Sequence, residues 1–437
     1  MDRRDFVKSS AVLGMAATLP RFSFANAKGS DRIKVGLVGC GGRGTGALRN
    51  MISADQNIEV VALADLFEEK PKMAVERVLK HVEQFGAAGK NIINPDKVKK
   101  FSGVNCLEEL LATDVDVVID ACSPAFRTPH YEKIVAAGKH AFLEKPACID
   151  ATQARKMFEL SKIADAKGLS VVCGTQRRYH PGYQEMIKRV QDGEIGEIVS
   201  AQCYWNDGDY VGRNQLRNTE LAIDTMEYQI RNWFSFIWAS GDHIVEQHVH
   251  NLDVIMWALG DNRKPQEVRA WGGRSTDLPV QKFGDRFSHF AVDFDMGEGL
   301  RLQSYCHQDP KTAREQGERL IGTTGVMYSS LGSKIGIQDR KGNTLWEAPK
   351  TDVQCLISEH KFLLDAVRSG KPVNKINQLI NSTLLAISGR MSAYSGKKFK
   401  FDWVLAKSQE NLCPEKIEFS KKMPWNGVPV PGQFQLV

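Results

Sequence analysis

The sequence predicts an α/β fold in two parts: a doubly wound parallel sheet in the N-terminal half, then an α+β domain with an open, mostly antiparallel sheet. Short apolar runs alternate with helix-compatible segments between Ile33 and Cys173, which is typical of buried parallel strands connected by helices. After Pro181, strand-like runs separated by turns replace this alternation. A chain of 437 residues, 42% hydrophobic and 25% charged, is long enough to form two cores.

The first 27 residues have the features of an export signal. Arg3 and Arg4 precede a stretch of small and branched apolar residues, and a small-residue cleavage site, Ala25-Asn26-Ala27, follows. We therefore expect a twin-arginine signal peptide at 1–27 and a periplasmic location. The apolar stretch is shorter than the roughly 20 residues of a spanning helix, so we expect no membrane association after cleavage. A membrane anchor is the alternative.

The composition argues against several function classes. Lysine and arginine total 58 against 52 acidic residues, which gives a net charge of +6. The basic residues are spread along the chain with no polybasic run, so we expect no nucleic-acid partner. The nine cysteines form no CxxC pair, which argues against a zinc site or a disulfide framework. We predict no bound metal.

Five apolar runs are the predicted strands of the first sheet, at residues 33–38, 58–64, 115–122, 140–143 and 169–173. Helices are expected at 131–137, where Gly138 ends the helix, and at 151–166. Ligands of such sheets gather at the carboxyl ends of the strands. Three segments begin there: Ser123-Pro124, Glu144-Lys145-Pro146 and 174–179.

A glycine-rich turn joins the first strand to the helix after it. The turn reads Gly39-Cys40-Gly41-Gly42-Arg43-Gly44, and Asp65 closes the second strand 21 residues beyond Gly44. Glycines let the backbone approach a pyrophosphate, the helix start directs N–H groups at its charge, and the acid accepts hydrogen bonds from a ribose. The sequence therefore predicts a dinucleotide-binding Rossmann domain over 28–177. Because Asp65 repels a 2′-phosphate, we expect NAD rather than NADP. A structural turn in another α/β protein is the alternative.

Several short motifs, in their order along the chain, make it similar to a known family. They are the glycine turn, Asp65, the stretch at 129–140, Glu144-Lys145-Pro146 and Arg178-Tyr179-His180-Pro181. From about Ile33 onward the chain resembles the Gfo/Idh/MocA family, which includes glucose-fructose oxidoreductase and inositol dehydrogenase. The resemblance implies NAD as the cofactor. The expected cofactor-binding residues are the turn from Gly39 to Gly44, Asp65, Ser123, Pro124, His130, Glu144 and Lys145.

The second half of the chain is the predicted substrate-binding and oligomerisation domain, at 178–437. A helix is expected at 183–192, and strands are expected at 197–205, 267–271, 288–294 and 300–305. The resemblance implies that this sheet closes over the nicotinamide. Its outer face usually meets a partner in this family, so we expect a homo-oligomer.

A second family signature lies near residue 250. The family has an aspartate, a histidine four residues later and a further aspartate three residues on; Glu246, His250 and Asp253 occupy these positions and share one face if the segment is helical. By resemblance, His250 accepts the proton of the substrate hydroxyl and Glu246 lies beside it. His248 departs from the family, which has a small residue there. A metal site at residues 246, 248 and 250 is disfavoured, because a helix turns His248 away from the other two.

Lys145 is the remaining predicted catalytic residue. At the carboxyl end of a strand, beside a nicotinamide, burial and the positive ring lower the pKa of a lysine, so that it can help to move the substrate proton. A salt bridge with Glu144 is its alternative role, and a structural role is the alternative for His250 and His248. The predicted substrate-binding residues are Arg178, Tyr179, Trp205, His248 and Asp253. Trp205 is the preferred sugar contact, because sugar rings pack on aromatic rings.

These expectations combine into an exported oxidoreductase with tightly bound NAD. Free NAD is not expected in the periplasm, and the twin-arginine route exports folded proteins, so NAD would travel inside the enzyme and be recycled on it. We expect hydride transfer between a secondary hydroxyl of a sugar or glycoside and the nicotinamide. One alternative is an NAD-dependent glycoside hydrolase that uses transient oxidation, elimination and addition of water. The other is a non-catalytic sugar-binding protein.

Overall fold

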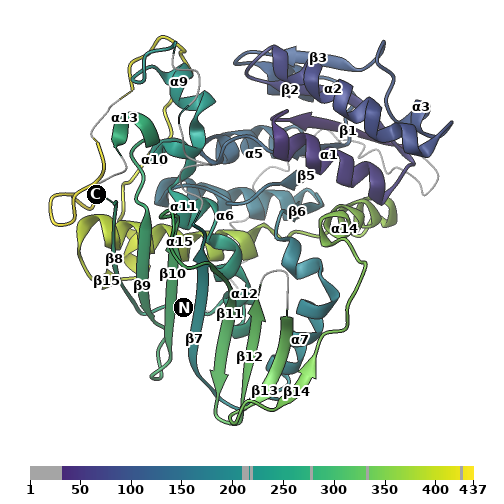
Figure 1. Ribbon diagram of the computed structural model, residues 1–437. Helices are drawn as coiled ribbons and strands as arrows, with labels where there is room; N and C mark the ends of the chain where they lie inside the picture. Colours follow the sequence, from purple (N-terminus) through teal and green to yellow (C-terminus); the bar gives the residue numbers. More distant parts are fainter. Residues whose placement is uncertain (1–31, 209–215, 217–219, 276–278, 331–333, 424–426) are drawn as a thin grey trace, which may run out of the picture.

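The computed structural model describes residues 32–208, 216, 220–275, 279–330, 334–423 and 427–437 (Figure 1). The predicted signal peptide at 1–27 lies outside these residues. Within them, two sheets are connected by helices that lie between them (Figure 1). No helix of the described chain combines the length and the apolar character that a bilayer crossing requires.

The first sheet has six parallel strands in the order β3-β2-β1-β4-β5-β6. They are β1 (Ile33–Val38), β2 (Ile58–Asp65), β3 (Lys99–Ser102), β4 (Val117–Asp120), β5 (His140–Leu143) and β6 (Val171–Cys173). The order reverses between β1 and β4, which is the doubly wound arrangement of a Rossmann fold, so the predicted fold class is confirmed. β1 and β4 are buried almost throughout, as continuous apolar runs require.

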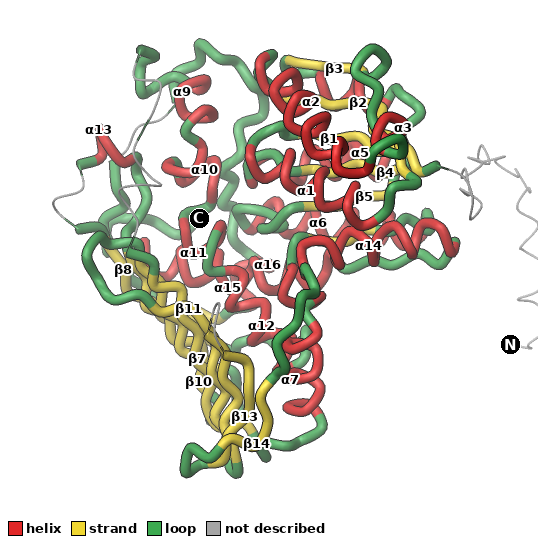
Figure 2. Tube along the Cα trace, turned by 45° about the vertical axis from the view of Figure 1, so that its right-hand side comes forward, coloured by secondary structure: helices red, strands yellow, loops and turns green. Residues whose placement is uncertain are grey.

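Helices cover both faces of the first sheet. On one face pack α1 (Gly42–Ala54) and α2 (Glu69–Val82); on the other pack α4 (Cys106–Leu111), α5 (Arg127–Ala136) and α6 (Ala151–Ala166). A helix from far along the chain, α14 (Cys355–Ser369), joins α1 on the first face (Figure 2). Its Leu363 and Leu364 share a core cluster with Val35. The predicted second domain therefore sends one helix back to the first sheet.

The second sheet has nine strands in the order β14-β13-β12-β11-β7-β10-β9-β8-β15. They are β7 (Ile198–Asn206), β8 (Glu267–Gly273), β9 (His289–Asp295), β10 (Arg301–His307), β11 (Glu315–Gly322), β12 (Gly325–Ser330), β13 (Lys334–Asp339), β14 (Thr344–Glu347) and β15 (Phe399–Lys400). β7 and β10 run parallel, and the other neighbours are antiparallel. The predicted open, mostly antiparallel sheet is confirmed.

Three longer helices cover one face of this sheet (Figure 2). α15 (Ile376–Ser395) lies against β8 and β9, α12 (Val249–Leu259) against β7 and β11, and α7 (Pro181–Gln191) against β13. Shorter helices fill the connections: α3 (Gly89–Ile92), α9 (Met226–Arg231), α10 (Ile237–Ser240), α11 (His243–Glu246), α13 (Val280–Phe283) and α16 (Asp402–Ala406). Together these elements place α11 and α12 between the second sheet and the carboxyl edge of the first.

Candidate active site

The glycine turn after β1 forms one side of a cleft at the carboxyl edge of the first sheet. Gly39 has a φ of 89°, and a Cβ atom there would lie 2.6 Å from the backbone of Ala121, so only glycine fits. Gly41 and Gly42 instead face open space. Because α1 begins without a side-chain cap, the N–H groups of its first turn are available to an anion.

Asp65 closes β2 beside this turn. Its Oδ2 accepts a hydrogen bond from the Cys40 N–H (2.7 Å), and its Oδ1 accepts one from the Phe67 N–H (3.0 Å). Burial raises the pKa of the carboxyl group, and the two N–H donors oppose this shift. The two bonds orient the carboxylate and leave each oxygen a lone pair for a ribose hydroxyl.

The cleft has a volume of about 230 Å³. Five of the predicted cofactor-binding residues line it: Gly39, Gly41, Asp65, Ser123 and His130. An open glycine cradle at a helix start, next to an oriented acid, fits the pyrophosphate and ribose of NAD. Of the other predicted residues, Cys40 and Pro124 are buried, and Gly44 lies so close to Gly39 that a Cβ atom would meet its carbonyl oxygen at 1.8 Å.

Arg43 and Glu144 pair with each other. Arg43 Nε donates to Glu144 Oε1 (2.5 Å), and Arg43 Nη2 lies 3.8 Å from Glu359 Oε1 of α14. Glu359 is fully buried, and burial together with the charge of Glu144 raises the pKa of its carboxyl group well above the ordinary value. Sequence reasoning missed Glu359, because it lies more than two hundred positions from its partners.

Lys145, Glu246 and His250 meet beyond the end of β5. Lys145 Nζ donates to the carbonyl oxygen of Glu246 and lies 3.7 Å from its Oε1. The rings of His250 and Trp205 stack with centroids 5.8 Å apart. The structure therefore brings the three predicted catalytic residues, and the preferred sugar contact, to one place.

Electrostatics keep His250 neutral. Burial, followed by the cationic side chains of Lys145, Arg177 and Arg43, holds the pKa of its imidazole well below 6.5. A neutral imidazole beside a lysine can accept a proton, which is what a general base requires.

The segment that carries Glu246 and His250 is helical but interrupted. α11 ends at Glu246 and α12 begins at Val249. Between them the His248 N–H donates to the carbonyl oxygen of His243, five residues back (3.1 Å), so the turn is wider than an α-helical one. The segment is therefore not one continuous helix, which was the condition for residues 246, 250 and 253 to share one face.

His248 contacts the second sheet. Its Nε2 lies 2.7 Å from Ser304 Oγ and 3.6 Å from Cys203 Sγ, and its side chain has no exposed surface. Burial, with a contribution from Arg177, lowers the pKa of His248 to about 3. These contacts are those of a packed histidine, and its predicted role in substrate binding stays a prediction.

Three other predicted substrate-binding residues have partners within the protein. Arg178 donates to both carboxylate oxygens of Asp253 (2.8 and 2.9 Å) and to Asp261 Oδ1 (2.7 Å). The Tyr179 ring packs on Phe362 of α14 at 5.6 Å. The structure thus brings Arg178 and Asp253 together as a buried ion pair that joins the end of the first domain to α12.

A second buried ion pair lies beside it. Arg177 donates to Glu318 of β11, which also accepts from Asn251 Nδ2 (2.6 Å), and the guanidinium lies 5.9 Å from the Trp205 ring. Sequence reasoning missed Arg177 and Glu318, which are 141 residues apart. No local pattern connects them.

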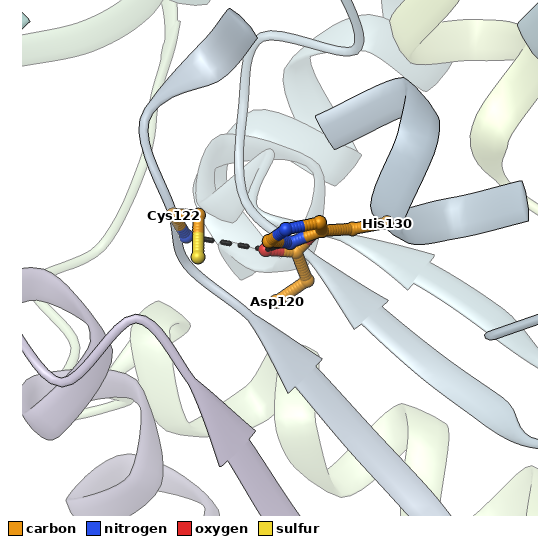
Figure 3. Close-up of side chains that lie close together, drawn as sticks. All are labelled: Asp120, Cys122 and His130. Carbon is orange, nitrogen blue, oxygen red and sulfur yellow. Dashed lines mark hydrogen bonds and ion pairs between the residues drawn. The ribbon is translucent and has the colours of Figure 1, made fainter. Parts of the chain in front are cut away.

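Asp120, Cys122 and His130 form a cluster with the composition of a metal site (Figure 3). Arg127 lies 3.7 Å from Asp120 Oδ1, which also accepts a hydrogen bond from the Cys122 N–H (3.1 Å). Burial and the charge of Asp120 raise the pKa of the Cys122 thiol well above 9.0. Because the Asp120 carboxylate is already balanced by the Arg127 guanidinium, we assign no metal to this cluster.

Comparison with known proteins identifies the first domain. Residues 33–173 match the family model GFO_IDH_MocA, described as "Oxidoreductase family, NAD-binding Rossmann fold". Inositol 2-dehydrogenase of Klebsiella pneumoniae (strain 342) is 24% identical over 320 residues, which cover 73% of this chain and 80% of the relative. Inositol 2-dehydrogenase of Pseudomonas fluorescens (strain SBW25) is 26% identical over 352 residues, 78% and 87% of the two chains.

Solved structures share the fold. GenD2 from gentamicin A biosynthesis, in complex with NAD, has a TM-score of 0.61 at 19% identity, covering 85% of this chain and 96% of that one. Scyllo-inositol dehydrogenase from Lactobacillus casei, with bound NAD(H) and scyllo-inositol, has a TM-score of 0.62 at 17% identity and covers 85% of this chain and all of that one (100%). The likeness extends across both domains.

Proposed function

We propose that this chain, an NAD-dependent oxidoreductase of the Gfo/Idh/MocA family that resembles the inositol dehydrogenases, oxidises a secondary hydroxyl of a cyclitol, sugar or glycoside. We base this proposal on the meeting of Lys145, Glu246 and His250 at the carboxyl edge of the first sheet, the same edge at which the cleft that fits NAD lies. The names of the relatives favour an inositol or a similar ring with several secondary hydroxyls.

The residues of the site divide the proton chemistry between them. His250, held neutral by burial and by nearby cations, accepts the proton of the substrate hydroxyl. The Lys145 ammonium donates a hydrogen bond to the same oxygen and stabilises the negative charge that develops on it. Glu246 holds Lys145 through its carbonyl oxygen. When bound, NAD supplies the nicotinamide that accepts the carbinol hydrogen as hydride.

Trp205 supports a ring-shaped substrate. Its ring stacks on His250, and its indole Nε1 is buried without an acceptor among the described residues. An aromatic face and a free N–H beside the base suit the C–H face and a hydroxyl of a polyhydroxylated ring.

The location and the fate of the cofactor complete the proposal. Arg3 and Arg4, with the cleavage site at 25–27, support export by the twin-arginine route to the periplasm. There NAD stays bound, and reduction of a second sugar on the same enzyme restores the oxidised form. Assembly of copies through the outer face of the second sheet is part of the same proposal.

The test starts from protein purified without added cofactor. Denaturation should release NAD or NADH in stoichiometric amount, and incubation with a panel of inositols, sugars and aryl glycosides should reduce the bound nicotinamide and leave a ketone product. Absence of any nicotinamide response across the panel, with NAD bound, would contradict dehydrogenase activity. Release of phenol from an aryl glycoside with no persistent ketone would instead identify the hydrolytic alternative.

A further inference from the structure

We propose that a strap from outside the first domain completes the cofactor site and holds NAD in it. The strap consists of α9, the 3-10 helix Trp233–Ser235 and the C-terminal segment 412–423. The inference rests on the proposed retention of NAD and names the residues responsible for it.

The strap forms part of the wall of the cofactor cleft. Four strap residues line the same cleft as Asp65 and the glycine turn: Ile230, Arg231 and Trp233 from the second half of the chain and Ile417 from the C-terminal segment. Val104 and Leu107 of the first domain line it as well. Apolar and aromatic side chains next to a ribose-binding acid suit the flat adenine ring of NAD.

The strap is attached to the turn that positions Asp65. Phe67, whose N–H donates to Asp65, stacks on Phe419 of the C-terminal segment with ring centroids 5.6 Å apart and planes 13° apart. The guanidinium of Arg231 lies 3.7 Å from the centre of the Phe67 ring, and Arg231 Nη1 pairs with Glu69 of α2 (2.9 Å). Both parts of the strap therefore meet on Phe67, two residues from the acid.

Backbone hydrogen bonds join the two parts of the strap. The Met226 N–H donates to Lys421 O (2.9 Å), the Glu227 N–H donates to Phe419 O (3.2 Å), and the Met423 N–H donates to Asp224 O (2.7 Å). In Figure 1 the C-terminal segment (yellow) runs beside α9. The two parts move as one unit, because separating them would break all three bonds.

A hydrophobic cluster of its own underlies the strap. The cluster contains Phe67 and Phe126 of the first domain, Met226 of α9 and Met423 of the C-terminal segment. It is separate from the two clusters that bury the faces of the sheets. Opening the strap would expose this cluster to water, so the strap opposes release of a nucleotide bound beneath it.

The experiment measures release of NAD from the holoenzyme. Wild type, Phe419→Ala and Trp233→Ala are loaded with labelled NAD, and its dissociation is followed during a chase with excess unlabelled NAD. The control is Phe434→Ala, which removes another C-terminal aromatic ring that packs on Tyr394 at 5.4 Å, away from the cleft. Circular dichroism of every variant checks the fold, and Phe419→Leu replaces Phe419→Ala if the latter does not fold.

The two strap variants should release NAD roughly 10- to 100-fold faster than wild type, while the control matches wild type. Folded strap variants that release NAD as slowly as wild type would overturn the strap while leaving the proposed retention intact. A wild-type protein that loses its NAD within seconds would overturn the retention itself.

Discussion

Replacing Arg178 by methionine distinguishes a structural role from the predicted role in substrate binding. In the structure Arg178 is 8% exposed, Asp253 is 2% exposed, and two hydrogen bonds of 2.8 and 2.9 Å connect them. Arg178→Met keeps most of the side-chain volume but leaves Asp253 with Ser382 Oγ (2.8 Å) as its side-chain donor. We expect this variant to lose stability rather than affinity for substrate.

The expected loss of stability in Arg178→Met follows from the burial of the Arg178–Asp253 ion pair. Removing one member of a buried ion pair leaves an uncompensated charge and costs about 3–5 kcal/mol of unfolding free energy. Loss of the contact with Asp261, whose side chain is 24% exposed, adds at most about 1 kcal/mol. In the double variant Arg178→Met/Asp253→Asn the stranded charge is gone and the amide can still accept from Ser382. The double variant should then lose only about 1–2 kcal/mol of unfolding free energy. This loss is smaller than the sum of the losses of the two single variants, and the difference is a coupling energy of a few kcal/mol.

The assay is urea unfolding of wild type, both single variants and the double variant, each saturated with NAD so that cofactor binding contributes equally. Steady-state kinetics on the same samples supply the second readout. A structural role for Arg178 is contradicted if the free energy of unfolding of Arg178→Met lies within about 0.5 kcal/mol of wild type and the variant instead raises KM for the sugar. That result would place the guanidinium on the substrate.

Three further predictions concern Lys145, Asp65 and His140. Lys145→Met should lower kcat by about 10²- to 10⁴-fold, measured as turnover per NAD bound, with the bound NAD counted by extraction; a loss under tenfold would contradict its role in stabilising the charge on the substrate oxygen. Asp65→Asn should weaken NAD binding by roughly 10- to 100-fold and reduce the discrimination against NADP, measured by equilibrium titration; an unchanged preference would count against the ribose contact. Burial lowers the pKa of His140 to about 4, and its Nδ1 accepts from the Ser170 N–H. As the pH falls, His140 therefore gains its proton in the unfolded chain before it does so in the folded protein. Up to roughly 3 kcal/mol of stability present at neutral pH is lost as the pH falls from about 6.5 to 4. His140→Gln keeps the acceptor without titrating, so its unfolding free energy should fall less over that range; parallel curves would contradict the assignment.

Five of the six strands of the first sheet can be predicted from the sequence, because they are apolar runs that are largely buried. Residues 33–38 and 140–143 are strands with the predicted bounds, since a continuous apolar run has few alternatives. β3, which was not predicted, is an edge strand that carries Lys99 and Lys100 and is mostly exposed, so no apolar run marks it. α15 was missed for the opposite reason: it is buried on nearly every side and shows no amphipathic stripe.

In the candidate site, residues that belong to short motifs could be predicted from the sequence, whereas contacts between distant residues could not. Lys145, Glu246 and His250 are predictable from short motifs whose spacing the family resemblance supplies, and the structure brings them together. The contacts of Arg177 with Glu318, and of Phe67 with Phe419, join positions far apart in the chain. No local periodicity encodes such pairs, because they form only when the second domain and the C-terminal segment have packed against the first.

A crystal structure of the protein saturated with NAD and an inositol would show whether the glycine turn, Asp65, Lys145 and His250 act on one bound cofactor and substrate. The expected complex has the adenosine ribose on Asp65, the pyrophosphate at the glycine turn, and the nicotinamide beside Lys145 and His250 with a substrate hydroxyl between those two side chains. A cleft that stays empty at saturating NAD, or a nicotinamide at the opposite end of the cleft from Lys145 and His250, would contradict it.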